Sequence, residues 1–162
     1  MKETLAYPTW DQIDQGCSRI VSEVHRRLES EIEPTLIVGL ARGGLIPAVR
    51  LSHLFRQTPM ISINYSSSHD GAKGETQRVD QKLIPGDNTK AYHAPRGSHV
   101  LIVDDIADSG HTLKEVAQSY LDHGCIVTTA VLYSKEGSVI TPDIVWQEIP
   151  HDAPWIIFPW EL

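Results

Sequence analysis

The stretch that most constrains the fold is residues 100–112, where an unbroken apolar run ends in two adjacent acids. Val-Leu-Ile-Val at residues 100–103 is typical of a strand buried on both faces of a parallel sheet. Asp104 and Asp105 follow directly, at the strand end where open α/β sheets bind ligands. Residues 108–112 then carry two hydroxyls and a glycine ahead of a helical pattern, and such helix starts bind phosphate. This order of residues predicts a site for a sugar phosphate.

The composition favours one globular domain of 162 residues with a sizeable core, because 41% of the residues are hydrophobic and 22% are charged. The net charge of −7 argues against a broad nucleic-acid surface, so we expect no nucleic-acid partner. Cys17 and Cys125 have no metal or redox spacing and are interpreted as buried thiols in a reducing compartment. No apolar run approaches the roughly 20 residues of a membrane span, and the start of the chain lacks an apolar signal core. We therefore expect a cytoplasmic protein without membrane contact.

Hydrophobic periodicity predicts helices that alternate with strands along the chain. The expected helices are residues 10–30, 45–55 and 112–123, and the expected strands are residues 36–40, 59–65, 100–103, 126–133 and 144–147. Thr9 is the predicted N-cap of the first helix and Gly124 the stop signal of the third. This alternation predicts a single α/β domain over residues 1–162, with a mostly parallel sheet flanked by helices.

Two further segments stand apart from this pattern. Residues 66–97 form a long polar stretch with scattered glycines and prolines, and unpatterned loops of this length in compact domains are often functional. Residues 155–160 read Trp-Ile-Ile-Phe-Pro-Trp and make the C-terminal tail strongly aromatic.

Three stretches in this order resemble one known family. Residues 100–112 match the phosphoribosyl pyrophosphate (PRPP) signature of type I phosphoribosyltransferases, except that Ala107 stands where a larger aliphatic residue is usual. Ala-Arg-Gly-Gly at residues 41–44, directly after a strand, looks like the pyrophosphate loop of the family. Residues 9–11 and 155–160 are similar to the two ends of the xanthine-guanine and archaeal-type hypoxanthine-guanine enzymes.

The resemblance implies that the chain is a purine phosphoribosyltransferase of purine salvage. Such an enzyme transfers phosphoribosyl from PRPP to a 6-oxopurine (guanine, xanthine or hypoxanthine), giving a nucleoside 5′-monophosphate and pyrophosphate. The resemblance also implies Mg²⁺ as cofactor, a homodimer or homotetramer, and a mobile lid at about residues 66–97. A base-binding hood is expected at about residues 134–162.

The resemblance also implies a role for each matching residue. Asp104 and Asp105 accept hydrogen bonds from the ribose hydroxyls, directly or through Mg²⁺. Asp108 is the expected catalytic residue, facing purine N7. The 5-phosphate is expected on Ser109, Gly110, His111 and Thr112. Pyrophosphate is expected on Arg42, Gly43 and Gly44, where the peptide before the arginine is often cis in the family. Lys135 is expected at the 6-oxo group, Trp155 stacked on the purine, and the backbone of Ile156 at the 2-position.

Simpler interpretations remain open at this stage. Asp104, Asp105 and Asp108 could cap a loop, because aspartate does so readily. The Arg42 loop could be an ordinary turn, Lys135 a solvated cation and Trp155 a core residue. At the level of function, a PRPP-binding regulator without turnover and a type I enzyme for another nucleobase are the alternatives.

Overall fold

The computed structural model describes residues 5–28, 33–64 and 94–162. Its main sheet has five strands in the order β3-β2-β4-β5-β6, and every neighbouring pair is parallel. The strands are β2 (Leu36–Ala41), β3 (Met60–Asn64), β4 (His99–Ala107), β5 (Ile126–Lys135) and β6 (Ile144–Ile149). The helices are α1 (Trp10–Arg27), α2 (Leu45–Leu54) and α3 (His111–Asp122). The α/β fold with a parallel sheet is therefore confirmed.

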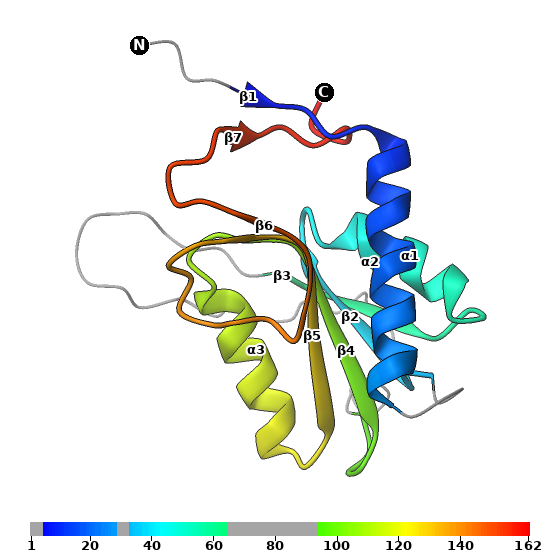
Figure 1. Ribbon diagram of the computed structural model, residues 1–162. Coiled ribbons are helices and arrows are strands. Elements are labelled where there is room, and N and C mark those ends of the chain that lie inside the picture. The colour runs from blue at the N-terminus through cyan, green and yellow to red at the C-terminus, as the bar shows by residue number, and fades with distance from the viewer. Residues whose placement is uncertain (1–4, 29–32, 65–93) are drawn as a thin grey trace.

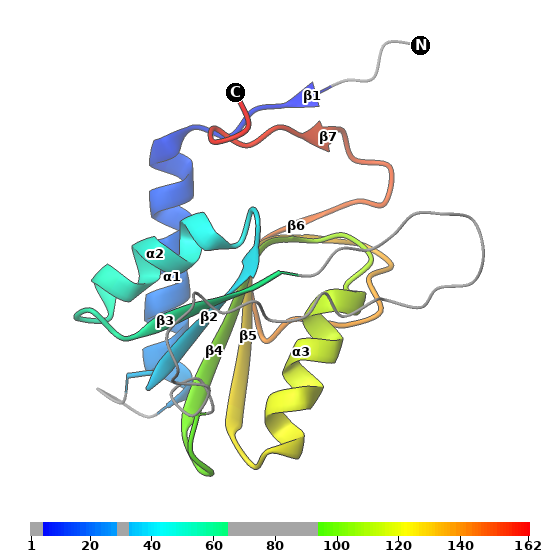
Figure 2. The ribbon, with the colours of Figure 1, turned by 180° about the vertical axis from the view of Figure 1, so that it is seen from behind.

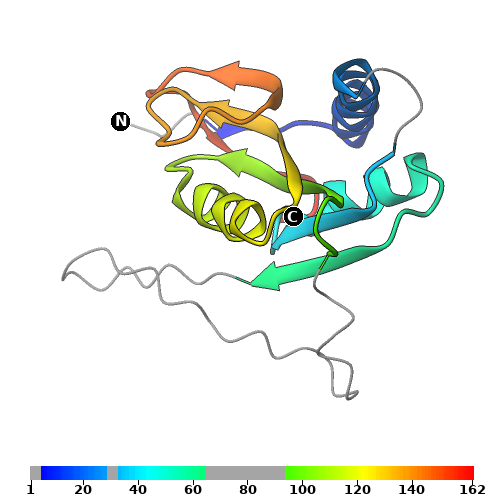
Figure 3. The ribbon, with the colours of Figure 1, turned by 90° about the horizontal axis from the view of Figure 1, so that it is seen from below.

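Helices cover both faces of the sheet, as the view from below shows (Figure 3). On one face α1 and α2 pack against the sheet through a core that includes Ile20, Leu51 and Leu132. On the other face α3 packs through a second core that includes Ile102 and Leu113. Burial on both faces explains why the central strands are nearly continuous runs of aliphatic residues.

The strand order reverses direction between β2 and β4. The chain leaves β2 through α2 to reach β3, and it leaves β4 through α3 to reach β5. These two crossovers run in opposite directions from neighbouring strands, on opposite faces of the sheet (Figure 1). Ligands of open α/β sheets bind at such a switch point, beyond the carboxyl ends of the strands.

A second, two-stranded sheet joins the ends of the described chain. β1 (Leu5–Ala6) pairs in parallel with β7 (Trp155–Ile156), and the Ile157 N–H donates to the Ala6 carbonyl at 2.9 Å. The pair lies beyond the carboxyl end of the main sheet, at the top of Figures 1 and 2. The sequence pattern did not predict it, because two-residue strands carry no detectable periodicity.

Some predicted boundaries are corrected by the structure. β4 does not end at residue 103 but runs to Ala107, because Asp104 and Ile106 continue the ladder with β5. The two acids therefore lie within the strand rather than after it. α3 begins one residue earlier than predicted, at His111. α1 ends at Arg27, and the predicted end at residue 30 lies outside the described residues.

The predicted cap and stop residues are confirmed. Thr9 accepts from the Gln12 N–H, and the Gln12 side chain accepts from the Thr9 N–H, which completes a capping box. Gly124 follows the C-cap of α3 with a φ of 80°. The predicted lid lies outside the described residues, except for residues 94–97, which lead through a turn into β4. None of the described helices is long and apolar enough to cross a membrane.

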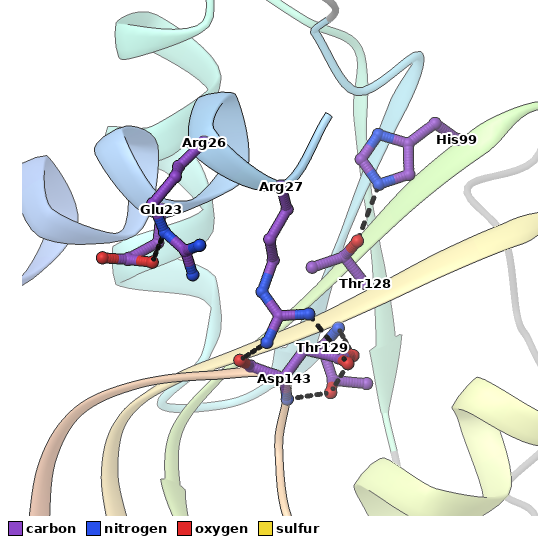
Figure 4. A network of polar contacts seen from close by, with 7 residues as sticks. All are labelled: Glu23, Arg26, Arg27, His99, Thr128, Thr129 and Asp143. Carbon is purple, nitrogen blue, oxygen red and sulfur yellow. Dashed lines mark hydrogen bonds and ion pairs between the residues drawn. The ribbon is translucent and has the colours of Figure 1, made fainter. Parts of the chain in front are cut away.

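The edge strand β6 is fixed at its start by a polar network (Figure 4). Asp143 Oδ2 accepts from the Thr129 N–H and from the Thr129 hydroxyl, both at 2.9 Å, and Thr129 Oγ1 accepts from the Asp143 N–H. Arg27, at the end of α1, pairs with the same aspartate. The network holds β5, β6 and α1 together at the end of the sheet where the strands begin.

Candidate active site

The Ala-Arg-Gly-Gly loop (residues 41–44) and the paired acids (residues 104 and 105) meet at the carboxyl ends of β2 and β4. A side-chain carbon on Gly43 would lie 1.7 Å from Asp105 Oδ2, so only glycine fits beside this carboxylate. A side-chain carbon on Gly44 would lie 2.7 Å from the Val103 carbonyl oxygen. The peptide between Ala41 and Arg42 is cis, as the resemblance implied. The predicted pyrophosphate loop and the predicted PRPP motif are therefore in direct contact.

Asp104 and Asp105 form a partly buried pair of carboxylates. Asp104 Oδ1 accepts from the Asp105 N–H at 2.9 Å, and Asp105 Oδ1 accepts from the Ile106 N–H at 2.8 Å. Burial raises the pKa of both carboxyl groups, and the neighbouring charge of Asp105 raises the pKa of Asp104 further. Neither carboxylate forms a salt bridge with a residue that the structure describes. A cation or a pair of hydroxyl donors would stabilise their charged forms.

A small pocket lies beside this pair. Its volume is about 110 Å³, which suits a single small group, and most of its lining comes from the end of β4 and the start of α3. The lining residues are Asp104, Ile106, Ala107, Asp108, Ser109, Gly110, Thr112 and Leu113. The first N–H groups of α3 have no partners within the helix and carry its positive end. We call residues 108–112 the phosphate loop. Three of its four predicted 5-phosphate ligands, Ser109, Gly110 and Thr112, line this pocket, whereas His111 is exposed at the start of α3.

Lys135 reaches the phosphate loop from the end of β5. Its Nζ lies 3.3 Å from Asp108 Oδ1, and the side chains are 22% and 54% exposed. The structure therefore brings Lys135, the residue predicted at the 6-oxo group, next to Asp108, the predicted catalytic residue. The two residues are 27 positions apart in the sequence. The interpretation of Lys135 as a fully solvated surface residue is wrong.

Trp155 and Ile156 lie on β7, above the carboxyl ends of the main strands (Figure 1). Trp155 is 58% exposed, whereas Ile156 is only 7% exposed. Its exposure rules out Trp155 as a core residue and leaves much of its surface free. The side chain of Ile156 belongs to the core, so only its backbone is available to a ligand.

A chain of aromatic rings that the sequence did not reveal fixes the C-terminal segment. Trp160 stacks on Phe158 with 4.6 Å between ring centroids, and Phe158 contacts Tyr133 of β5 at 5.7 Å. Trp160 also contacts Trp10 at the start of α1, at 5.9 Å. The aromatic residues of the tail are visible in the sequence. Their partners Tyr133 and Trp10 were not predicted, because they lie far from the tail along the chain. The rings tie β7 to the strand that carries Lys135.

Glu161 lies at the C-terminus, where it affects both the local turn and the paired carboxylates. Its Oε2 accepts from the Phe158 N–H at 2.8 Å, which fixes the turn at the C-terminus. Its negative charge also raises the pKa of Asp105, although less than burial does. The site is thus strongly acidic on the side of the paired carboxylates.

Comparisons with known proteins agree with this arrangement. Residues 9–162 match the phosphoribosyl transferase domain family, and the chain belongs to that family. A purine phosphoribosyltransferase structure from Pyrococcus horikoshii is similar over 98% of this chain and 95% of its own, with a TM-score of 0.75 and 31% identity.

Two bacterial xanthine-guanine phosphoribosyltransferases are similar to this chain along most of their length. The xanthine-guanine phosphoribosyltransferase of Gluconobacter oxydans is 30% identical over 156 residues, which cover 94% of this chain and 82% of that protein. The protein of the same description from Cereibacter sphaeroides is 28% identical, over 100% of this chain and 93% of that protein. The family resemblance predicted from the three sequence stretches is therefore confirmed.

Proposed function

We propose that this chain transfers phosphoribosyl from PRPP to a 6-oxopurine in purine salvage. The observation that carries the proposal is the 3.3 Å contact between Lys135 Nζ and Asp108 Oδ1. An ammonium beside a carboxylate matches a 6-oxopurine edge, on which an acceptor (O6) neighbours a donor (N7–H). Adenine presents an amino group in place of O6, and that group would face the ammonium of Lys135 as a second donor. Relatives described as xanthine-guanine enzymes support the same substrate class.

The proposed chemistry needs one proton acceptor. The lone pair of N9 forms a bond to C1 of the ribose while the bond from C1 to the pyrophosphate oxygen breaks. Asp108 takes the proton from N7, and its 54% exposed carboxylate is free to approach the base once Lys135 turns to O6. The remaining residues position the reactants and stabilise charge.

The groups around Asp108 each hold one part of PRPP. The phosphate loop binds the 5-phosphate through Ser109, Gly110, His111 and Thr112. Arg42, with Gly43 and Gly44, binds the pyrophosphate, for which a guanidinium offers a planar pair of donors. Trp155 stacks on the purine, and the backbone of Ile156 reads its 2-position. The predicted lid would exclude water from the reaction.

Asp104 and Asp105 are the proposed Mg²⁺ ligands and the acceptors of the ribose hydroxyls. Their fit to a hard cation rests on their chemistry, because two partly buried carboxylates with raised pKa values gain from a nearby positive charge. No group of three metal-binding side chains occurs in the parts of the chain that the structure describes. Mg²⁺ ordinarily keeps one or two carboxylates and completes its shell with water and substrate oxygens, and it would neutralise the pyrophosphate charge.

The assembly and the location belong to the same proposal. We expect a homodimer or homotetramer in the cytoplasm, acting on PRPP and a purine base without nucleic acid or membrane. Val49 on α2 is 46% exposed and is a candidate for an apolar contact between copies. Light scattering after gel filtration measures the assembly directly.

Pyrophosphate release tests the function. Purified protein is given PRPP and Mg²⁺ with guanine, hypoxanthine, xanthine, adenine, uracil or orotate, one base at a time. We expect turnover with the 6-oxopurines and a loss of about 10²–10⁴ in kcat for Asp108→Asn. Turnover only with another base would move the assignment to that nucleobase. Tight PRPP binding without any turnover would favour a regulator.

A further inference from the structure

The turn between β5 and β6 lies directly behind the phosphate loop. We call residues 136–140 the β5–β6 turn. The Val139 N–H donates to the Ser109 carbonyl at 2.9 Å. A side-chain carbon on Gly110 would lie 2.2 Å from Ser138 Oγ and 2.7 Å from Ile140 Cγ2. Two consecutive residues of the phosphate loop are therefore held by three consecutive residues of the turn.

The Val139 hydrogen bond sets the direction of a donor in the phosphate loop. The Ser109 carbonyl and the Gly110 N–H belong to one planar trans peptide, so they point in opposite directions. Because the carbonyl points at the turn, the Gly110 N–H points away from it. The pocket of about 110 Å³ is lined by Ser109 and Gly110 but not by Val139. The bond thus fixes the direction of the Gly110 N–H in a residue that lines the pocket.

The steric contact fixes the same peptide from behind. Gly110 has a φ of 78°, a left-handed conformation that costs glycine little. Ser138 and Ile140 occupy the space of the missing side chain, so the loop cannot move back toward the turn. Ser138 Oγ is buried and has no hydrogen-bond partner among the described residues, which leave this hydroxyl unpaired at the contact.

The turn is anchored independently of the phosphate loop. The Glu136 N–H donates to the Ile149 carbonyl at 2.9 Å, and the Ser138 N–H donates to the Lys135 carbonyl at 3.2 Å. Ser138 and Ile140 of the turn also line a cavity of about 400 Å³, together with Glu148 of β6. Val139 itself is 44% exposed, so its side chain contributes little to packing.

We propose that Val139 is a positioning residue for the 5-phosphate, acting through its backbone N–H. The inference rests on the proposed function, because it takes the phosphate loop as the 5-phosphate site. It predicts that a residue which touches no substrate controls affinity for the phosphate end of PRPP. It also predicts that affinity for pyrophosphate, which has its proposed site at Arg42, does not depend on Val139.

A matched pair of variants separates the backbone group from the side chain. Val139→Pro removes the N–H, whereas Val139→Ala keeps it and trims an exposed side chain. Binding of ribose 5-phosphate, PRPP with Mg²⁺, and pyrophosphate with Mg²⁺ is measured by calorimetry on full-length protein. We expect Val139→Pro to weaken ribose 5-phosphate and PRPP by about tenfold, with pyrophosphate unchanged. Val139→Ala should bind all three ligands as wild type does.

Steady-state kinetics provide the second readout. For Val139→Pro, KM for PRPP should rise about tenfold while KM for the base stays within about twofold. A merely structural role would lower the amount of folded protein and leave both KM values unchanged. Ribose 5-phosphate binding equal to wild type in folded Val139→Pro would overturn the inference, as would equal weakening in Val139→Ala.

A second pair covers the case in which Val139→Pro does not fold. Ser138→Val adds bulk against Gly110 and should weaken ribose 5-phosphate binding, whereas Ser138→Ala should retain it and raise Tm by removing an unpaired buried hydroxyl. Unchanged binding in Ser138→Val would contradict the inference. Wild-type protein that binds neither PRPP nor ribose 5-phosphate would instead refute the proposed function, and with it this inference.

Discussion

At the scale of single residues, the paired carboxylates couple ligand binding to pH. Burial raises the pKa of Asp104 and Asp105 in the free protein, so protonation reaches them above the ordinary value of 3.8. Mg²⁺ and ribose hydroxyls, the ligands proposed for this pair, would stabilise the charged forms and lower these pKa values again. The proposed assignment therefore predicts that binding of PRPP with Mg²⁺ releases protons, and that its affinity falls as the pH is lowered toward the raised pKa values.

Calorimetry in buffers of different ionisation enthalpy measures this release. We expect a net loss of protons that becomes smaller as the pH is raised away from the raised pKa values of the pair. Asp104→Asn should reduce the release. Proton uptake on binding at pH 5–6 would contradict the assignment of this pair to Mg²⁺ and the ribose hydroxyls.

His99 is a residue whose protonation should affect stability but not catalysis. It is 5% exposed at the start of β4, and its Nε2 lies 2.8 Å from Thr128 Oγ1 (Figure 4). Its buried Nδ1 has no hydrogen-bond partner in residues 5–28, 33–64 and 94–162. Burial lowers the pKa of His99 below its ordinary 6.5, so the unfolded chain takes up the proton first. Its contribution to stability is therefore complete above about pH 6.5 and is lost as the pH falls.

Urea unfolding between pH 5 and 7 checks this sign. Wild type should lose more free energy of unfolding on acidification than His99→Gln, which cannot titrate. The paired aspartates act in the opposite direction in both proteins, because their raised pKa values favour the folded state at low pH. The difference between the two proteins isolates His99, and equal slopes would show that its pKa is the same in the folded and the unfolded state.

At the scale of elements, the edge strand β6 depends on one side chain. Thr129 is 3% exposed, and its N–H and hydroxyl both donate to Asp143 Oδ2. Asp143→Ala leaves these two buried donors unpaired, which should cost about 1–3 kcal/mol. Arg27→Ala removes an ion pair whose side chains are 40% and 42% exposed, so solvent screening limits its effect to about 1 kcal/mol or less.

Thermal unfolding of the two variants compares them directly. Asp143→Ala should have the lower Tm by several degrees, and hydrogen exchange should increase in β6 before the central strands. An equal loss in both variants would mean that the ion pair, and not the pairing with Thr129, fixes the start of β6.

At the scale of the whole molecule, we expect different residues of the C-terminal segment to serve base binding and stability. Trp155 is 58% exposed, whereas Phe158 is 3% exposed and contacts both Tyr133 and Trp160. Trp155→Ala should raise KM for the base about tenfold through lost stacking, with little change in Tm. Phe158→Ala should destabilise the protein by about 3–5 kcal/mol, because it leaves a cavity between the tail and β5.

Tyr7→Ala is the matched control, since Tyr7 is an exposed aromatic residue of similar exposure (57%) near β1. It should leave KM and Tm unchanged. Should Tyr7→Ala raise KM for the base as much as Trp155→Ala does, the effect would not be specific to the proposed stacking residue.

Local signals in the sequence were sufficient for much of this fold and site. The five main strands and three helices follow from apolar periodicity, and the N-cap Thr9 and the stop residue Gly124 follow from side-chain and backbone chemistry. The glycine loop at residues 41–44 and the acids and hydroxyls at residues 104–112 occur in the order that is typical of the family. This order was sufficient for the family resemblance. Boundaries were less secure: β4 continues through Asp104, because pairing with β5 outweighs the local preference of aspartate for loops.

What the sequence by itself determined is therefore the class of fold and the family, and it supplied the site residues as predictions. The tertiary structure alone decided which distant residues touch: Gly43 with Asp105, Lys135 with Asp108, Val139 with Ser109, and β1 with β7. The physical reason is that periodicity and capping act over a few neighbouring residues, whereas these contacts join segments brought together only when the sheet forms. Spacing along the chain carries no record of such contacts, so their distances had to come from the fold.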